Sequence, residues 1–292
     1  MKHQLRNEYI HAEFDTIGGT LTSLKLGGAE YLWQGDERYW KGQSPVMFPI
    51  CGSLREEKAV IGKNKRCNMI RHGFARFEEF IKSEQSQESI SFSLYSNTAT
   101  LEKYPYPFVL TITYRLDKKK LTVNYRIENP GEEPMPFFVG GHPGFNWPLD
   151  PKDKPSEYVI EFEYPETVHC PLPAEDPLLL DMTKRREILH SERILTLDHS
   201  LFQQDALVFD TLKSRKVRYY NPVGKSGVEV EFQDFPFLVL WSTKNGGPFV
   251  AIEPWLGVST CTEEDDTFEH KRNVQIAAPG EKRNYQFSIN LL

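Results

Sequence analysis

Apolar and polar residues alternate along much of the chain, and this pattern predicts an antiparallel β protein. In residues 89–94, isoleucine, phenylalanine and leucine take every second position, and serines take the others. A period of two indicates a strand with one buried face. The same alternation recurs in residues 108–115 and 121–128, with a charged turn at residues 117–120 between them. We therefore expect these two segments to form a β-hairpin.

Other segments show the same signals more briefly, and helical signals are few. Residues 178–189 are mixed, and residues 259–268 are too acidic and too short for a long core helix. The proline-rich and charged residues 151–205 are interpreted as excursions from a sheet. The pattern favours an all-β fold with few short helices, built as two packed sheets or a barrel. Further strands are expected at residues 158–164, 217–220, 228–232, 237–241, 249–252 and 285–291.

Composition narrows the class of protein. The chain has 292 residues, of which 39% are hydrophobic and 26% charged, which is typical of a globular protein. Its 35 basic and 41 acidic residues give a net charge of −6, which argues against a nucleic-acid partner. No apolar run is long enough for a membrane helix, and the first residues lack the apolar stretch of a signal peptide.

The spacing of the cysteines indicates where the protein is expected to be located and whether the sequence contains a zinc motif. The four cysteines are scattered and form no Cys-x-x-Cys pair, so zinc and thiol-redox motifs are absent from the sequence. We expect free thiols, a cytoplasmic location and no membrane partner. His169, His190, His199 and His270 are isolated and show no metal-ligand spacing.

Ionisable and aromatic residues gather in a few stretches rich in glycine and proline. The first contains Trp33 and Trp40, which either bridge parts of the core or form an apolar wall for a sugar ring. The second contains Arg71, His72 and Arg76, whose donors suit a ligand rich in hydroxyls or phosphate. A solvated turn with surface arginines is the alternative.

Two further stretches supply the best acid and base candidates. His142 follows an apolar strand and two glycines, and imidazole titrates near neutral pH, so this histidine is a candidate general acid. Glu253 comes at the end of an otherwise apolar strand, where burial would raise the pKa of its carboxyl and make it a better base. Both residues could instead satisfy local hydrogen bonds.

Weaker candidates lie near residue 207. Asp205 and Asp210 flank a short apolar segment, and one of them could bind a ligand hydroxyl. Their odd separation would place them on opposite faces of a strand. The acidic residues 263–266 lack the order of a calcium loop and are interpreted as a solvated turn.

Taken together, these stretches resemble the aldose 1-epimerase (galactose mutarotase) superfamily, with the LacX-like bacterial branch as the nearest match. The resemblance is carried by five blocks in order, from about residue 31 to residue 257. They are Trp33 to Gly52 with Ser44-Pro45-Val46-Met47-Phe48-Pro49, His72-Gly73-Phe74-Ala75-Arg76, Gly141-His142-Pro143-Gly144-Phe145-Asn146, Asp205-Ala206-Leu207 and Glu253-Pro254-Trp255.

The resemblance implies a β-sandwich of the galactose mutarotase type, with residues 1–292 as one domain. It also implies interconversion of the α and β anomers of an aldose without a cofactor or metal. His142 matches the family's general acid and Glu253 its general base. The expected sugar-binding residues are His72, Arg76, Asp205, Arg55, Trp255, Phe74 and Asn146. Among aromatic residues, Trp255, Trp147 or Phe74 could stack on the C–H face of the sugar ring.

This sequence departs from the family pattern in places that affect sugar preference. Ser53 stands where well-studied members carry an arginine, and the nearest arginine is Arg55. Two alternatives therefore stay open: the same reaction on a hexose 6-phosphate, and a non-catalytic carbohydrate-binding protein on this fold. A glycoside hydrolase ranks last, because it normally needs two catalytic carboxylates and only Glu253 has a suitable setting. The sequence leaves the oligomeric state open.

Overall fold

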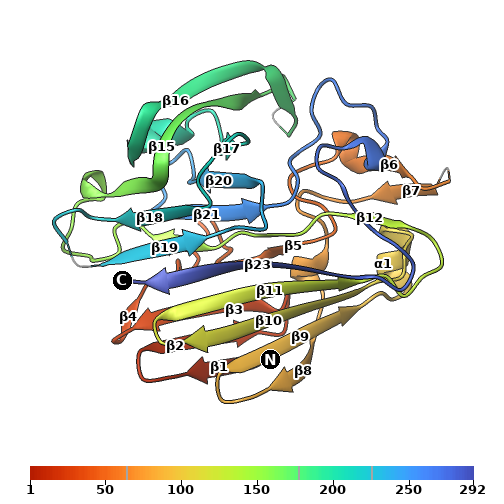
Figure 1. Cartoon of the computed structure of the whole chain (residues 1–292), viewed down its shortest axis with the longest axis horizontal. Coiled ribbons are helices and arrows are strands. Elements are labelled where there is room, and N and C mark those ends of the chain that lie inside the picture. The colour runs from red at the N-terminus through yellow and green to blue at the C-terminus, as the bar shows by residue number, and fades with distance from the viewer. Residues whose placement is uncertain (64, 177, 225) are drawn as a thin grey trace.

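The computed structural model describes residues 1–63, 65–176, 178–224 and 226–292, and antiparallel strands dominate it (Figure 1). The largest sheet in these ranges has nine strands and runs across the molecule. Its order is β16 (Leu180–Thr196), β15 (Val159–Pro173), β18 (Lys216–Tyr220), β19 (Gly227–Glu231), β23 (Lys282–Leu291), β11 (Lys120–Glu128), β10 (Val109–Asp117), β9 (Ser89–Tyr95) and β8 (Ile81–Gln85).

A six-stranded sheet contains β21 (Phe249–Trp255), the strand of Glu253 and Trp255. Its order is β17 (Leu207–Phe209), β20 (Phe237–Trp241), β21, β13 (Gly140–Gly141) and β5 (Val46–Met47), and β14 (Gly144–Asn146) also pairs with β21. The N-terminal sheet contains β1 (Lys2–Arg6), β2 (Ile10–Asp15), β3 (Thr20–Leu26) and β4 (Ala29–Glu30). Two small pairs complete the strands: β6 (Lys58–Ile61) with β7 (Lys65–Asn68), and β12 (Met135–Phe137) with β22 (Gln275–Ala277).

Helical structure in the described ranges is limited to short segments. The α-helix α1 (Thr98–Lys103) begins at Asn97, whose side chain accepts a hydrogen bond from the Thr100 amide and so caps the first turn. None of these helices is long and apolar enough to cross a membrane. The remaining turns are 3₁₀ segments: η1 (Arg55–Glu57), η2 (Ala75–Phe77), η3 (Pro155–Glu157), η4 (His199–Phe202) and η5 (Phe268–His270).

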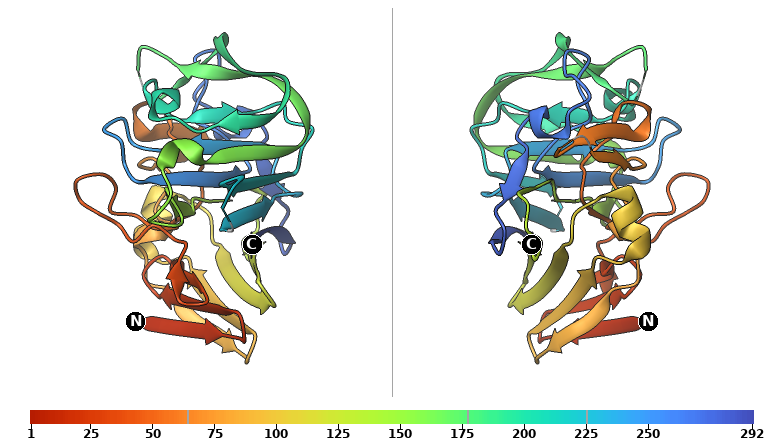
Figure 2. Two further views of the ribbon diagram at one scale, coloured as in Figure 1. Left: turned by 90° about the vertical axis from the view of Figure 1, so that its left-hand side faces the viewer. Right: turned by 90° about the vertical axis from the view of Figure 1, so that its right-hand side faces the viewer.

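The sheets form a sandwich because each presents an apolar face to the other. In the N-terminal half, Phe14 of β2 packs against Phe92 of β9 and Tyr114 of β10. Figure 2 shows the red N-terminal strands and the yellow-green strands β10 and β11 as two layers that face each other. One hydrophobic cluster runs through the described residues from Leu5 to Leu291. The predicted all-β sandwich is therefore confirmed, and the single-domain organisation stays a prediction.

Most predicted strands are present, and two interpretations were wrong. The hairpin of residues 108–128 forms as β10 and β11, with Asp117 paired to Lys120 across the turn. Residues 151–205, expected as excursions, supply β16, which forms one edge of the nine-stranded sheet, and β15, which pairs beside it. Of the mixed residues 178–189, residues 180–189 are strand, because β16 pairs along β15 through several bulges. Such an edge strand leaves charged side chains in solvent.

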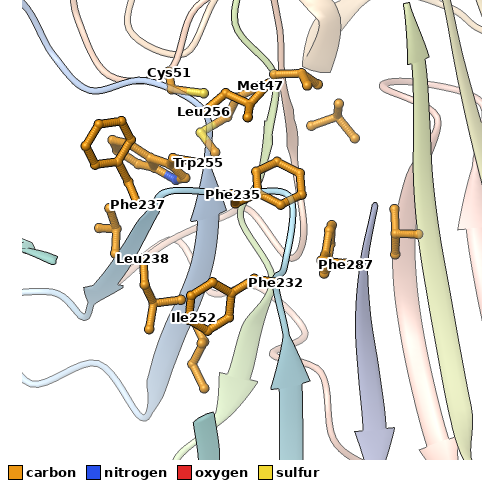
Figure 3. Packing of buried hydrophobic residues seen from close by; sticks show 14 of the residues in the cluster. Met47, Cys51, Phe232, Phe235, Phe237, Leu238, Ile252, Trp255, Leu256 and Phe287 are labelled. Atoms are coloured by element: carbon orange, nitrogen blue, oxygen red, sulfur yellow. The ribbon is translucent and has the colours of Figure 1, made fainter. Parts of the chain in front are cut away.

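Phe287 links the core to the six-stranded sheet. Its ring lies 6.0 Å from that of Tyr125 and 6.1 Å from that of Phe235, and Figure 3 shows Phe287 and Phe235 in the interior between β21 and β23. A Cβ atom on Gly141 would lie 2.8 Å from the Phe287 ring. Glycine is therefore required at residue 141, because the backbone of β13 lies directly against the phenyl ring.

Replacing Phe287 by alanine should destabilise the protein by roughly 3–5 kcal/mol, because it leaves a cavity between the two sheets. Chemical denaturation measures this loss. The matched control is Tyr95→Ala on β9, since Tyr95 is 52% exposed and should change stability by about 0.5 kcal/mol or less. Equal stabilities for the two variants would contradict this description of the core.

Candidate active site

The register of two strands places His142 opposite Glu253. Gly140 of β13 pairs with Trp255 of β21, and Gly144 of β14 pairs with Ala251. His142 lies midway between those glycines, at the break between β13 and β14, so its partner position on β21 is Glu253. Directly opposed residues on antiparallel strands project from the same face of the sheet.

His142 and Glu253 are both buried and nearly touch. His142 Nδ1 lies 3.3 Å from Glu253 Oε2, with side chains only 8% and 1% exposed. The orientation does not make a hydrogen bond, and Nδ1 has no other partner in the described part of the chain. The sequence analysis placed Glu253 at the end of its strand, but it lies inside β21, because the strand continues to Trp255.

Burial sets the ionisation of this pair. It raises the pKa of Glu253 well above its usual value, and the indole N–H of Trp255 and the positive charge of Arg71 oppose this in part. Burial also lowers the pKa of His142 to about 3, with Arg71 adding to the effect. Burial thus disfavours the charged form of both groups, and the two titrate as a coupled pair.

Aromatic rings fix both side chains. The indole Nε1–H of Trp255 donates a hydrogen bond of 3.1 Å to Glu253 Oε2. The ring of Trp40 stacks on the His142 imidazole, with centroids 4.7 Å apart, and Trp241 meets the same imidazole edge-on at 5.5 Å. A stacked indole restricts rotation of the imidazole.

His72 reaches the same place from a separate loop. Its backbone N–H donates to Gly52 O at 2.7 Å, and the Gly52 N–H donates to His72 Nδ1 at 3.1 Å. Since Nδ1 accepts a hydrogen bond and burial lowers the pKa of this imidazole, the proton of the neutral ring is on Nε2. The ring lies edge-on to His142, with centroids 5.6 Å apart.

Glycine at residue 73 allows the His72 loop to form. Both His72 and Gly73 have positive φ angles, 67° and 71°. A Cβ atom on Gly73 would lie 2.2 Å from the carbonyl oxygen of Phe48, which accepts hydrogen bonds from the Phe74 and Ala75 amides. A larger side chain at residue 73 would therefore displace the loop that carries the imidazole.

Charged residues surround the buried pair. Arg71 Nη1 lies 3.9 Å from Asp205 Oδ2, and both side chains are partly exposed. Arg76 donates from Nη2 to Arg71 O at 2.8 Å, and its buried Nε has no hydrogen-bond partner among the described residues. Asp205 is placed by β17, which pairs with β20, the neighbour of β21.

All of these side chains line one cavity of about 400 Å³. That volume lies in the usual range for small-molecule sites. Sequence reasoning missed Ala206, Val239, Trp241, Thr243 and Lys244, although Val239 and Trp241 alternate along β20 and so share a face. The lining consists of Trp40, Arg71, His72, Arg76, His142, Asp205, Ala206, Val239, Trp241, Thr243, Lys244, Glu253 and Trp255.

Three predicted sugar-binding residues lie elsewhere in the described structure. Arg55 pairs with Asp266 at 2.9 Å and donates to backbone carbonyls of residues 261 and 264. Phe74 is buried in the core against Phe48, and Asn146 donates to Glu30 O. These assignments are corrected because each side chain already has a structural partner outside the cavity lining.

Trp147 and Asp210 also lie away from the cavity. The Trp147 indole donates to Pro155 O, and its ring packs against His199. Asp210 forms a two-point pair with Arg185, at 2.9 and 2.8 Å. Asp205 is thus the aspartate of the two that faces the cavity. Among the residues described, no three His, Cys, Asp or Glu side chains come close enough together to hold a metal ion.

Comparison with known proteins gives the context for this cavity. The family model described as aldose 1-epimerase matches residues 1–290. Two proteins of Lactococcus lactis subsp. lactis, the plasmid and chromosomal forms of Protein LacX, are each 41% identical to this chain over 298 residues. The alignments cover 100% of both chains. The predicted relationship to the LacX-like branch is confirmed.

Solved structures agree with the sequence relatives. A galactose mutarotase related enzyme from Lactobacillus acidophilus superimposes with a TM-score of 0.93 at 30% identity, covering 100% of this chain and 97% of the other. A galactose mutarotase-like protein from Lactobacillus casei gives a TM-score of 0.92 at 26% identity, covering 100% of both chains.

Removing the indole donor should change how the buried pair titrates. The Trp255 N–H stabilises the carboxylate form of Glu253, so Trp255→Phe should raise the pKa of this carboxyl further. If the pair needs its one proton to act, the alkaline fall in kcat/KM should then move to higher pH. The matched control is Trp241→Phe, which also removes an indole from the lining but no hydrogen bond to Glu253. A shift in the control alone, or to lower pH in Trp255→Phe, would contradict this role.

Proposed function

This chain belongs to the aldose 1-epimerase family, and we propose on that basis that it interconverts the α and β anomers of an aldose in the cavity shared by His142 and Glu253. The family and the fold support a sugar epimerase or mutarotase role. The observation that carries the proposal is the 3.3 Å approach of the two buried side chains at the wall of one cavity. Such a pair can exchange protons with both oxygens on the anomeric carbon, the C1 hydroxyl oxygen and the ring oxygen.

Anomer exchange needs two proton transfers at neighbouring oxygens. In ring opening, Glu253 accepts the proton of the C1 hydroxyl, and His142 donates a proton to the ring oxygen. The bond between C1 and the ring oxygen breaks as the C1 carbonyl forms. Rotation about the C1–C2 bond then turns the other face of the aldehyde toward the C5 hydroxyl. Each correctly placed acid or base group increases the reaction rate by roughly 100- to 10,000-fold.

Ring closure returns both residues to their starting forms. The C5 hydroxyl attacks the carbonyl carbon and gives its proton to His142, while Glu253 returns its proton to the C1 oxygen. The pair carries one proton throughout, so no cofactor has to regenerate it. Burial disfavours the charged form of each group, so the proton is assigned to the pair and not to one residue. Either placement gives the same pH dependence, because the proton belongs to the pair.

The remaining side chains of the cavity bind and orient the sugar. His72 presents its Nε2–H as a fixed donor, because Nδ1 is occupied by the Gly52 amide. Asp205 accepts hydroxyl protons, and Arg71 donates to hydroxyl oxygens beside it. Trp255 offers an aromatic face for the C–H groups of the ring. These roles account for the polar lining around a buried acid/base pair.

Glu253→Gln should lower kcat by roughly 100- to 10,000-fold, because an amide neither accepts nor returns the proton. Polarimetry of fresh α-glucose and α-galactose measures the rate above the buffer background. His142→Ala should lose activity similarly. The matched control is Glu84→Gln on the exposed edge strand β8, which should equilibrate the sugars as fast as wild type. Anomerisation by Glu253→Gln at the wild-type rate would refute the proposal.

A 6-phosphorylated aldose is the second candidate substrate. Three cationic side chains line the cavity, those of Arg71, Arg76 and Lys244, and guanidinium groups bind phosphate in two-point fashion. The carboxylate of Asp205 lies 3.9 Å from Arg71 and offsets part of this positive charge.

The two substrates are separated by comparing kcat/KM for glucose and glucose 6-phosphate. If the cations bind a phosphate, glucose 6-phosphate should be preferred, and Arg71→Ala should reduce that preference by at least about tenfold, as loss of one charge-assisted contact predicts. Equal or faster turnover of glucose by the wild-type protein would remove this candidate.

A further inference from the structure

A second cavity adjoins the first and is larger. Its volume is about 610 Å³, and it shares Trp40 and Arg76 with the cavity of His142 and Glu253. Trp40 stacks on the catalytic imidazole with one part of its surface while also lining this second space. The two cavities therefore meet at these two side chains.

The lining of the second cavity combines aromatic rings with hydrogen-bonding groups. Tyr39 and Phe77 offer apolar faces, and Phe77 is 59% exposed. Thr22 and Gln43 lie among the lining residues, beside Arg76. Faces for C–H groups next to hydroxyl and amide groups suit a saccharide ring, which has both kinds of surface.

Two of these residues have polar atoms that the described structure leaves without partners. They are Thr22 Oγ1 and Arg76 Nε, both buried. A buried polar atom without a partner is costly, so groups of this kind are commonly satisfied by a ligand or water. The carboxylates of the second cavity are already paired: Asp15 accepts from the chain's N-terminal amine and the Ile17 amide, and Glu37 pairs with Lys41.

No histidine lies in this lining, so the second cavity has no counterpart of the His142–Glu253 pair among the described residues. We propose that it is a binding subsite for the second ring of a reducing disaccharide, whose reducing ring occupies the first cavity. The subsite would bind its ring without reacting with it. This inference rests on the proposed function, because it takes the first cavity as the place where the anomeric carbon binds.

The experiment compares reducing disaccharides with their monosaccharide. Wild-type kcat/KM is measured by polarimetry for glucose, lactose (1→4 linked) and melibiose (1→6 linked), with glucose 6-phosphate as a further arm. We expect at least one disaccharide to exceed glucose by roughly tenfold, the gain of about one aromatic contact. Where glucose is turned over, equal or slower turnover of both disaccharides would overturn the subsite, whatever the result with glucose 6-phosphate.

Tyr39→Ala tests whether the second cavity is the cause. It should remove the preference for the disaccharide and leave kcat/KM for glucose unchanged, because Tyr39 lines the second cavity and not the first. Tyr95→Ala, an exposed tyrosine outside both cavities, is the matched control and should keep the preference. A preference that survives Tyr39→Ala would contradict the assignment.

Calorimetry with Glu253→Gln separates this inference from the proposed function. Tighter binding of the disaccharide than of glucose supports the subsite even if wild type anomerises no sugar. If wild type anomerises glucose but disaccharides bind Glu253→Gln no more tightly than glucose, the function stands and the subsite fails.

Discussion

The antiparallel register between β21 and the broken strand β13–β14 is the constraint on which the site depends. It brings His142 and Glu253 face to face, although 110 positions of the chain separate them. Rigid paired strands hold these side chains more firmly than loops would. His142 lies in the break between β13 and β14 and is not part of the regular strand pairing. The pairing of Gly140 and Gly144 with β21 on either side of the break holds its position.

Burial gives this geometry its chemistry. A carboxyl group among apolar strand neighbours resists ionisation, and an imidazole in the same surroundings resists protonation. In the mechanism that we propose, the two groups share one proton and exchange protons with two oxygens of the sugar. The hydrogen bond from the Trp255 indole partly opposes the rise in the pKa of Glu253. The Trp40 ring stacks on the imidazole of His142 and restricts its rotation. We propose that the outer charges, Arg71 and Asp205, bind hydroxyl groups of the sugar.

The sequence was sufficient to predict the fold class and the pair, but not how the pair is arranged. Alternation identified β9, β10 and β11 because each has one buried face. It missed β1, where Leu5 is the single buried position among charged and polar neighbours. It misjudged Arg55 because proximity to a motif says nothing about Asp266, a partner more than 200 residues away. Register between distant strands is likewise invisible in local pattern, so Trp241 and Lys244 were not found.

A structure of the Glu253→Gln variant with bound glucose tests the account most directly. The account predicts that the C1 hydroxyl lies within about 3 Å of the side chain at residue 253, and the ring oxygen within about 3 Å of the imidazole of His142. A sugar bound with its anomeric carbon away from both side chains, or outside their cavity altogether, would contradict it.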